Sequence, residues 1–315
     1  FNTASSFVVQ KDSISVTYLK AKEYYENKNY TNSLRISLEL LREKTLTNSE
    51  LILINHLIAN IFFESRSSKN SVKYYRKTLL YLNKSKDKEF DINNKDDLLL
   101  DRNLIIAENL LSLGSSYYRL FAENDKRIYK DSSFYFYNEV DKLMFNDKNV
   151  LKIKSRAYTN LSGIFMNDSL YDKAKSYALK SIEIHKQLNN KVNQAAALGN
   201  LSSIYLSENN FSEAKKVYFE ALDLIRNIKT SKALEVRESL YYNLAYNLYL
   251  LKDYKAYDYQ ELSYIIKDSL RDKEFRGMIA EITEKYNFDA KKSLLLKEEE
   301  NKRLKAQRTF WIFGV

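Results

Sequence analysis

The 315-residue chain contains no cysteine, no proline, five glycines and two histidines. Without cysteine, neither a disulfide framework nor a zinc site built on thiolates can form. Glycine and proline make tight turns and phosphate-binding loops, so their scarcity favours long helices joined by short polar connections. No linker rich in these residues divides the chain, and a one-dimensional stack of helical repeats therefore explains its length better than two globular domains do.

The residues that most enzyme and metal sites require are also scarce. His56 and His185 each stand alone in a helical segment, and we interpret both as packing or surface residues. The glycines are isolated, which excludes a phosphate loop, and we expect Gly163 and Gly199 to permit close approach of helices. Residues 298–300, three consecutive glutamates, are typical of a solvated helix face. We therefore predict no catalytic residue, no bound metal and no cofactor.

The formal net charge is +10, from 51 basic and 41 acidic side chains. Residues 291–308 alone carry seven basic against three acidic side chains, and the rest of the excess is spread over the chain. A dispersed charge of this kind is typical of a solvated surface, whereas nucleic-acid binding needs a concentrated patch. We predict that this part of the protein binds no nucleic acid.

Residues 195–225 show the clearest repeat unit. Apolar residues recur at helical spacing on both sides of the polar break 207–210, which predicts two antiparallel helices. Small residues stand where the two helices must approach closely, namely Ser202, Ala214 and Ala221. Large residues alternate with them, namely Leu198, Leu201, Tyr205, Phe211 and Tyr218.

The same pattern returns upstream in residues 157–184 and downstream in residues 239–266. In the downstream copy Tyr254 and Tyr264 occupy large slots, but Tyr257 stands where a small residue is usual. Three looser copies precede these, marked by Ala21 and Ser33, by Ala59 and Ser71, and by Leu113 and Gly114. We expect an extended loop at 122–131 and an exposed charged loop at 84–97.

This alternation of large and small residues resembles the tetratricopeptide repeat. The resemblance implies an all-α fold, a right-handed α-solenoid of about six tetratricopeptide-like helical hairpins followed by a long C-terminal linker helix. We predict an N-terminal segment at 1–13, the repeat superhelix at 14–272, a charged linker helix at 273–308 and the start of a transmembrane helix at 309–315.

Three copies place asparagine at one register, immediately before a leucine: Asn160, Asn200 and Asn243. In tetratricopeptide superhelices this position lies on the concave wall, and an amide can pair with the main chain of an extended peptide. Resemblance to peptide-binding members of the family implies this role here. Further groove candidates one turn away are Arg156, Ser203, Tyr242 and Tyr246. The alternative is that the asparagines bond a neighbouring helix or face water.

The C-terminal region changes from paired helices to one charged helix. A four-three spacing of Ala290, Leu294, Asn301 and Leu304 fits a short coiled coil, and hence a homodimer, as well as it fits a solvated linker. Residues 310–315 are apolar and aromatic, which we interpret as the beginning of a membrane span. Since Phe1 is no initiator methionine, we expect a fragment from which a signal peptide was removed.

Several loose motifs together resemble the sensor half of Bacteroidetes regulators: repeats, Asp268-Ser269-Leu270, Glu281 to Tyr286 as E-x-x-x-K-Y, a Lys/Glu linker and an aromatic-led membrane helix. The resemblance implies an inner-membrane protein with a periplasmic repeat domain. Beyond Val315 it implies a histidine kinase or a LuxR- or AraC-type domain that contacts DNA. Basic residues flank the membrane segment on the outer side, against the usual bias, which keeps open a cytoplasmic adaptor or constitutive scaffold.

Overall fold

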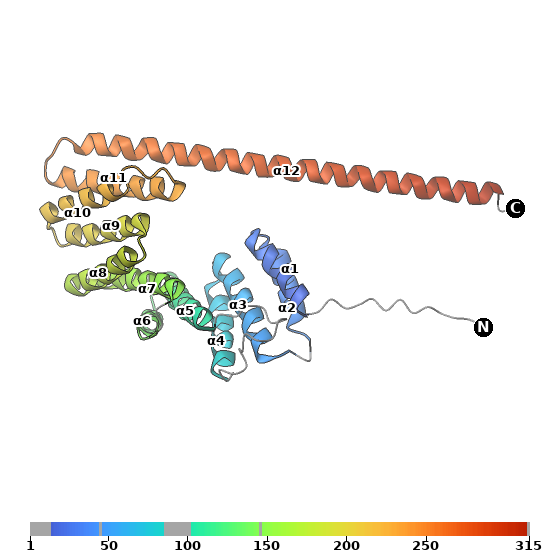
Figure 1. Ribbon diagram of the computed structural model, residues 1–315, viewed down its shortest axis with the longest axis horizontal. Helices are drawn as coiled ribbons and strands as arrows, with labels where there is room; N and C mark the ends of the chain where they lie inside the picture. Colours follow the sequence, from blue (N-terminus) through green and yellow to red (C-terminus); the bar gives the residue numbers. More distant parts are fainter. Residues whose placement is uncertain (1–13, 44–45, 85–101, 145–146, 314–315) are drawn as a thin grey trace. The chain divides into compact units, whose positions relative to one another are not determined.

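The computed structural model describes residues 14–43, 46–84, 102–144 and 147–313 (Figure 1). All regular elements in these ranges are α-helices, so the predicted all-α class is confirmed. The predicted N-terminal segment 1–13 and all but the first residue of the predicted loop 84–97 lie outside the described residues. The chain forms two compact units, which divide after Asn209.

The N-terminal unit consists of antiparallel helical hairpins and one further helix. Its helices are α1 (Ile14–Glu26), α2 (Tyr30–Leu40), α3 (Asn48–Glu64), α4 (Ser68–Lys84), α5 (Arg102–Asn124), α6 (Arg127–Asp141), α7 (Lys148–Asn167), α8 (Tyr171–Gln187) and α9 (Lys191–Ser207). Each odd-numbered helix up to α7 packs against the even-numbered helix that follows it. The odd-numbered helices also contact one another in sequence, α1 with α3, α3 with α5, and so on to α9. They therefore lie side by side along one face of this unit.

The C-terminal unit consists of α10 (Phe211–Leu224), α11 (Ser231–Leu250) and α12 (Ala256–Phe313), with α11 packed against both neighbours. The start of α12 buries Ala256 and Ser263 and partly buries Tyr259 and Ile266, a three-four spacing that keeps one face of this helix against the unit. α12 then continues past the end of α11 as a single helix (Figure 1). The predicted boundaries after residues 272 and 308 both fall inside it.

The residues at the crossings of paired helices are small, as the repeat pattern predicts. Ser162 on α7 is buried, and its hydroxyl donates to the carbonyl oxygen of Ala174 on α8 at 2.8 Å. Ser33 on α2 donates in the same way to Ala21 on α1 at 2.7 Å. A larger side chain at any of these positions would separate the helices, and a hydroxyl there is satisfied by the backbone it meets.

Two details of the predicted repeats are wrong. Residues 122–131 form no extended loop, because α5 continues to Asn124 and α6 starts at Arg127. In the last hairpin the buried small residue is Ala256 rather than Tyr257, which is 71% exposed, and Tyr254 and Tyr264 are exposed as well. The connection before α12 has five residues, against three before α8. The buried Ala256 nevertheless follows the left-handed Lys252 by four residues, whereas Ala174 follows the left-handed Ser169 by five, which shifts the register of α12 by one.

The tight turns between helices are made without glycine. Among the described residues, the turn positions with positive φ are Lys28, Arg66, Asp125, Ser169, Asn189, Asn209 and Lys252. After α7, the amide of Ser169 donates to the carbonyl of Met166 and the amide of Leu170 to that of Phe165, at 2.9 and 2.8 Å. This pair of hydrogen bonds satisfies the last carbonyl groups of the helix. It requires a residue in the left-handed conformation, which is usually glycine.

Replacing Ser169 by glycine should therefore stabilise the protein. Ser169 has φ 59° and is exposed, and relief of the left-handed strain should outweigh the entropy lost by glycine, for a gain of about 0.5–1 kcal/mol. Ser176, exposed in the middle of α8, provides a matched control, because glycine there should cost about 0.5 kcal/mol. Urea unfolding of both variants measures the difference, and shifts of the same sign would contradict the expectation.

In the described part of the chain, none of the helices combines the length and the apolar composition that crossing a bilayer requires. Of the residues predicted to begin a membrane span, Phe310 to Phe313 are helical within α12, and the last two lie outside the described residues.

Candidate functional site

A pocket of about 200 Å³ lies on the N-terminal unit where α5, α6 and α7 meet. Its lining residues are Tyr118 from α5, Tyr137 from α6, and Thr159, Asn160, Gly163, Ile164, Met166 and Asn167 from α7. Asn160 was predicted as a groove residue, and the structure places it in the wall of this pocket. Since α5 and α7 are neighbouring first helices, the pocket belongs to the face that these helices share.

Tyr137 is buried beneath the pocket because α5 carries no side chain at Gly114. A Cβ atom at Gly114 would lie 2.5 Å from Cε1 and 2.6 Å from Cδ1 of the Tyr137 ring. The ring of a fully buried tyrosine cannot retreat from such an overlap. Gly114 thus permits the close approach of α6 to α5, and the Tyr137 ring that it admits supports the wall of the pocket.

Gly163 has the opposite environment, and the expectation that it permits close helix approach is wrong. A Cβ atom built at Gly163 meets no atom within 4 Å. No neighbouring helix requires glycine at this position, so its effect is to leave space in the pocket wall. A residue with a side chain would fill part of the volume that the pocket now offers.

Polar groups converge on the pocket from all three helices. The amide nitrogen of Asn167 donates to the hydroxyl of Tyr118 at 3.1 Å, and the hydroxyl of Tyr137 donates to Ser115 at 3.1 Å. Burial raises the pKa of Tyr137, while hydrogen bonding with Ser115, Ser133 and Asn160 acts to lower it. The phenol is therefore neutral at physiological pH. The amides of Asn160 and Asn167, together with the hydroxyls, give the pocket an uncharged polar rim.

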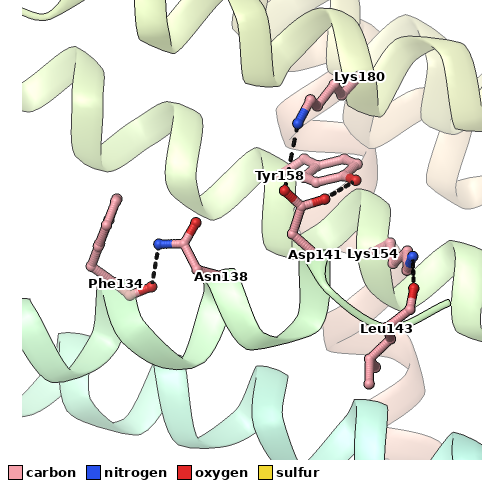
Figure 2. A network of polar contacts seen from close by, with 7 residues as sticks. All are labelled: Phe134, Asn138, Asp141, Leu143, Lys154, Tyr158 and Lys180. Atoms are coloured by element: carbon pink, nitrogen blue, oxygen red, sulfur yellow. Dashed lines mark hydrogen bonds and ion pairs between the residues drawn. The ribbon is translucent and has the colours of Figure 1, made fainter.

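A second polar cluster fixes α6, α7 and α8 relative to one another, as Figure 2 shows. Asp141, at the end of α6, accepts a hydrogen bond from Tyr158 of α7 and lies 3.5 Å from the ammonium of Lys180 on α8. Lys154 donates to the carbonyl of Leu143 in the connection that follows α6. Burial and the bond to Asp141 raise the pKa of Tyr158, so its hydroxyl remains a donor. The cluster holds α7 in the position that forms the pocket.

The other predicted groove residues of the N-terminal unit lie on the surface. Arg156 is exposed one turn before Asn160 on α7, and Asn200 is exposed on α9. Ser203 is half-buried, and its hydroxyl donates to the carbonyl of Gly199 at 3.0 Å within the same helix. The three asparagines share a register but not an environment, because Asn160 lines the pocket whereas Asn200 is exposed on α9.

The remaining predicted residues lie in the C-terminal unit, on α11. Tyr242 and Tyr246 are each 55% exposed, and Asn243 is half-buried. Tyr249, which the sequence analysis missed, is 67% exposed and continues the same row at a spacing of four and three residues. Tyr242, Tyr246 and Tyr249 are therefore surface residues, and they form an aromatic stripe along α11.

Sequence reasoning also missed several pocket residues. Asn167 lies seven residues after Asn160, and that spacing would have placed it on the same helix face. Tyr118 and Tyr137 carry no comparable signal, because their place in the pocket depends on how α5 and α6 pack against α7.

The two histidines lie on different helices, His56 on α3 and His185 on α8. His56 is buried as a packing residue, and its Nε2 atom lies 3.5 Å from the Glu108 carboxylate. Its ring also packs edge-on against Tyr75. In the part of the chain that the structure describes, histidine and carboxylate side chains form no group that could hold a metal ion.

The hairpins, their small buried crossing residues and the contacts between first helices define a tetratricopeptide-type repeat domain, a fold that typically serves protein interaction. Residues 154–227 match the family model described as a tetratricopeptide repeat. None of the curated proteins matches the sequence.

Solved structures with a similar fold include BtubC (BKLC) from P. vanneervenii, which is 15% identical, with a TM-score of 0.57 over 82% of this chain and 92% of that chain. Aspartyl phosphate phosphatase F from Bacillus subtilis is 12% identical, with a TM-score of 0.54 over 86% and 78%. The apo form of RapI is 17% identical, with a TM-score of 0.51 over 71% and 73%. Sequence identities this low show that the fold is similar. The function has to be argued from the site.

Proposed function

We propose that the face formed by α5 and α7 binds an extended peptide or an exposed segment of a partner protein. The observation that carries this proposal is the pocket beside Asn160. Its volume of about 200 Å³ lies below the roughly 300 Å³ at which pockets for small molecules begin, and it suits a single side chain.

The chemistry of the rim fits a peptide main chain. Asn160 and Asn167 each offer a donor and an acceptor, and such amides can pair with peptide groups whatever the sequence of the ligand. Ile164, Met166 and the open position at Gly163 give the interior an apolar character. One uncharged side chain of the ligand would be buried there while the neighbouring backbone bonds to the amides.

This binding would make the repeat domain the input of a membrane-anchored signalling regulator, with α12 as the connection to an output domain. Two features support this proposal. α12 leads from the repeat packing without interruption, and Leu294, Leu295 and Leu296 on it are each more than half exposed. Leucines in this state favour a partner helix, as in a homodimer with Leu294 and Asn301 at its seam. A ligand would then signal by binding one arrangement of the helices better than another.

A constitutive scaffold is the second candidate function. The exposed stripe of Tyr242, Tyr246 and Tyr249 on α11 favours it, since aromatic side chains are enriched where proteins meet. Deleting residues 273–308 from the full-length protein separates the two functions. Loss of the response to stimulus, with partner binding retained, supports the input domain, and an unchanged response supports the scaffold.

Filling the pocket tests the binding site directly. Gly163→Leu should abolish enrichment of peptides from a displayed random dodecapeptide library while the melting temperature stays the same or rises, since leucine is the better helix former. Gly163→Ala is the matched control, because its small side chain leaves most of the pocket open. Equal enrichment by the Gly163→Leu variant and the wild type would show that peptides bind elsewhere.

A further inference from the structure

The surface of α7 carries an unneutralised row of cations that leads to the pocket. Lys148, Lys152 and Arg156 are exposed and follow one another at four-residue intervals. Asn160, Gly163 and Asn167 continue the series at spacings of four, three and four, so all six residues lie on one face of the helix. Within the described residues, neither Lys152 nor Arg156 has an ion pair, and the ammonium of Lys152 meets only Asn149, at 3.3 Å.

Three other lysines of the N-terminal unit are neutralised by acids from other helices. Lys130 of α6 pairs with Asp168, and Lys175 of α8 lies 3.1 Å from Glu208. Lys180 pairs with Asp141 at 3.5 Å. In each case the acid lies at or just beyond the end of a neighbouring helix. Neither Lys152 nor Arg156 has such a partner among the described residues, and the row that they form leads to the pocket.

The row also works against the stability of its own helix. Like charges four residues apart cost about 0.2–0.5 kcal/mol per pair. Cations in the first half of a helix also face the positive end of its dipole, which at α7 is offset by the carboxylate of the N-cap residue Asp147 and by no acidic residue in the first turn. The row therefore adds nothing to the stability of α7, and its position beside the pocket suits a ligand of opposite charge.

We propose that the ligand of this face is an acidic peptide that buries one aliphatic side chain in the pocket and places carboxylates over Arg156 and Lys152. This rests on the proposed peptide-binding function and names the chemical class of the ligand. None of the residues that line the pocket is charged, so the buried side chain is uncharged, and the charges of the ligand lie outside it.

The helix sets the spacing of the groups in the ligand. Arg156 precedes Asn160 by four residues, about 6 Å of helix rise, and Lys152 lies about 6 Å further. An extended peptide that follows α7 advances about 3.3 Å per residue. Its acidic residues should therefore stand about two and about four positions from the aliphatic anchor.

Selection from the random dodecapeptide library tests this proposal on the whole chain. The wild type should enrich peptides that carry aspartate or glutamate on one side of a leucine, isoleucine or methionine. Lys152→Glu/Arg156→Glu should lower the affinity for the selected acidic peptide about tenfold or more, and should itself enrich basic peptides. Lys173→Glu/Lys186→Glu, an equal charge change on exposed positions of α8, should leave both results as in the wild type.

The outcomes separate this proposal from the one on which it rests. If peptides are enriched without acidic bias, or if the reversal on α7 changes nothing, the face binds peptides but the acidic class is wrong. Equal affinity for a single-stranded oligonucleotide of the same charge would likewise overturn the peptide class. If the wild type enriches no peptide beyond the Gly163→Leu variant, the proposed function fails and the acidic class fails with it. Circular dichroism verifies that each variant is folded.

Discussion

Between pH 10 and 12 the protein should lose its helices because buried tyrosines must ionise. Burial, with a smaller effect of the Glu26 carboxylate, raises the pKa of Tyr18 to about 12. Burial likewise raises the pKa of Tyr75, Tyr137 and Tyr158, the last with help from Asp141. The unfolded chain ionises these phenols near pH 10, whereas the folded chain does not. The contribution of these protonated phenols to the free energy of unfolding is fully present below pH 10. It is lost as the pH rises toward the pKa values of the folded protein.

Tyr18→Phe isolates one contribution. Among the described residues none hydrogen-bonds the Tyr18 hydroxyl, which is on a side chain only 9% exposed, so the free energy of unfolding at pH 7 should change by less than about 0.5 kcal/mol. The pKa shift of two units is worth about 2–3 kcal/mol at pH 12, and the variant should keep that stability. Circular dichroism and tyrosinate absorbance, followed through an alkaline titration, measure the effect. An unmoved alkaline midpoint would show that Tyr18 ionises without unfolding.

The helical hairpins could be predicted because helix packing restricts which residues can occur at the contacts. Two helices that cross closely need small residues at the crossing, and Ser162 with Ala174 satisfies this need in the structure as in the pattern. The failure at Tyr257 has a local cause. The buried slot comes four residues after the left-handed Lys252 instead of five, and the sequence around it contains no glycine or proline to mark where the turn ends.

The turn after α5 was missed for a related reason. Asp125 adopts positive φ and reverses the chain within two residues, where pattern reasoning expects glycine. In a chain so poor in glycine, left-handed turns are made by lysine, arginine, serine, asparagine and aspartate, which also occur within helices. The ends of its helices are therefore harder to predict from the sequence than the residues that the helices bury.

The candidate site could be predicted only in part. The asparagine register identified Asn160 because a repeat places equivalent residues on equivalent faces. It could not distinguish Asn160 from Asn200, since the difference comes from Tyr118 and Tyr137 on other helices. The sequence alone also does not show that Gly114 makes room for the Tyr137 ring. Its neighbour in space is a residue 23 positions later, and only the packed structure shows that the two meet.

Tyr137→Ala should be among the most destabilising single substitutions, at about 3–5 kcal/mol, because it removes a fully buried ring and leaves a cavity between α5, α6 and α7. Tyr137→Phe, which removes only the hydroxyl, should cost about 1 kcal/mol. Tyr135 is two residues away on the same helix but 56% exposed, and Tyr135→Ala should cost less than about 1 kcal/mol. Unfolding in urea measures all three. Similar losses at positions 135 and 137 would mean that α6 is rotated relative to this structure.

The contact between Tyr137 and Gly114 predicts a change of sign in a double-mutant cycle. In the wild type, Gly114→Ala should destabilise by about 1–3 kcal/mol, because its Cβ would overlap the ring at 2.5 Å. In the Tyr137→Ala background the ring is gone, and the same substitution should stabilise by up to about 1 kcal/mol, as alanine does for glycine within a helix. A Gly114→Ala effect of the same sign in both backgrounds would show that the ring does not rest on this glycine. The pocket would then have another support than the one described.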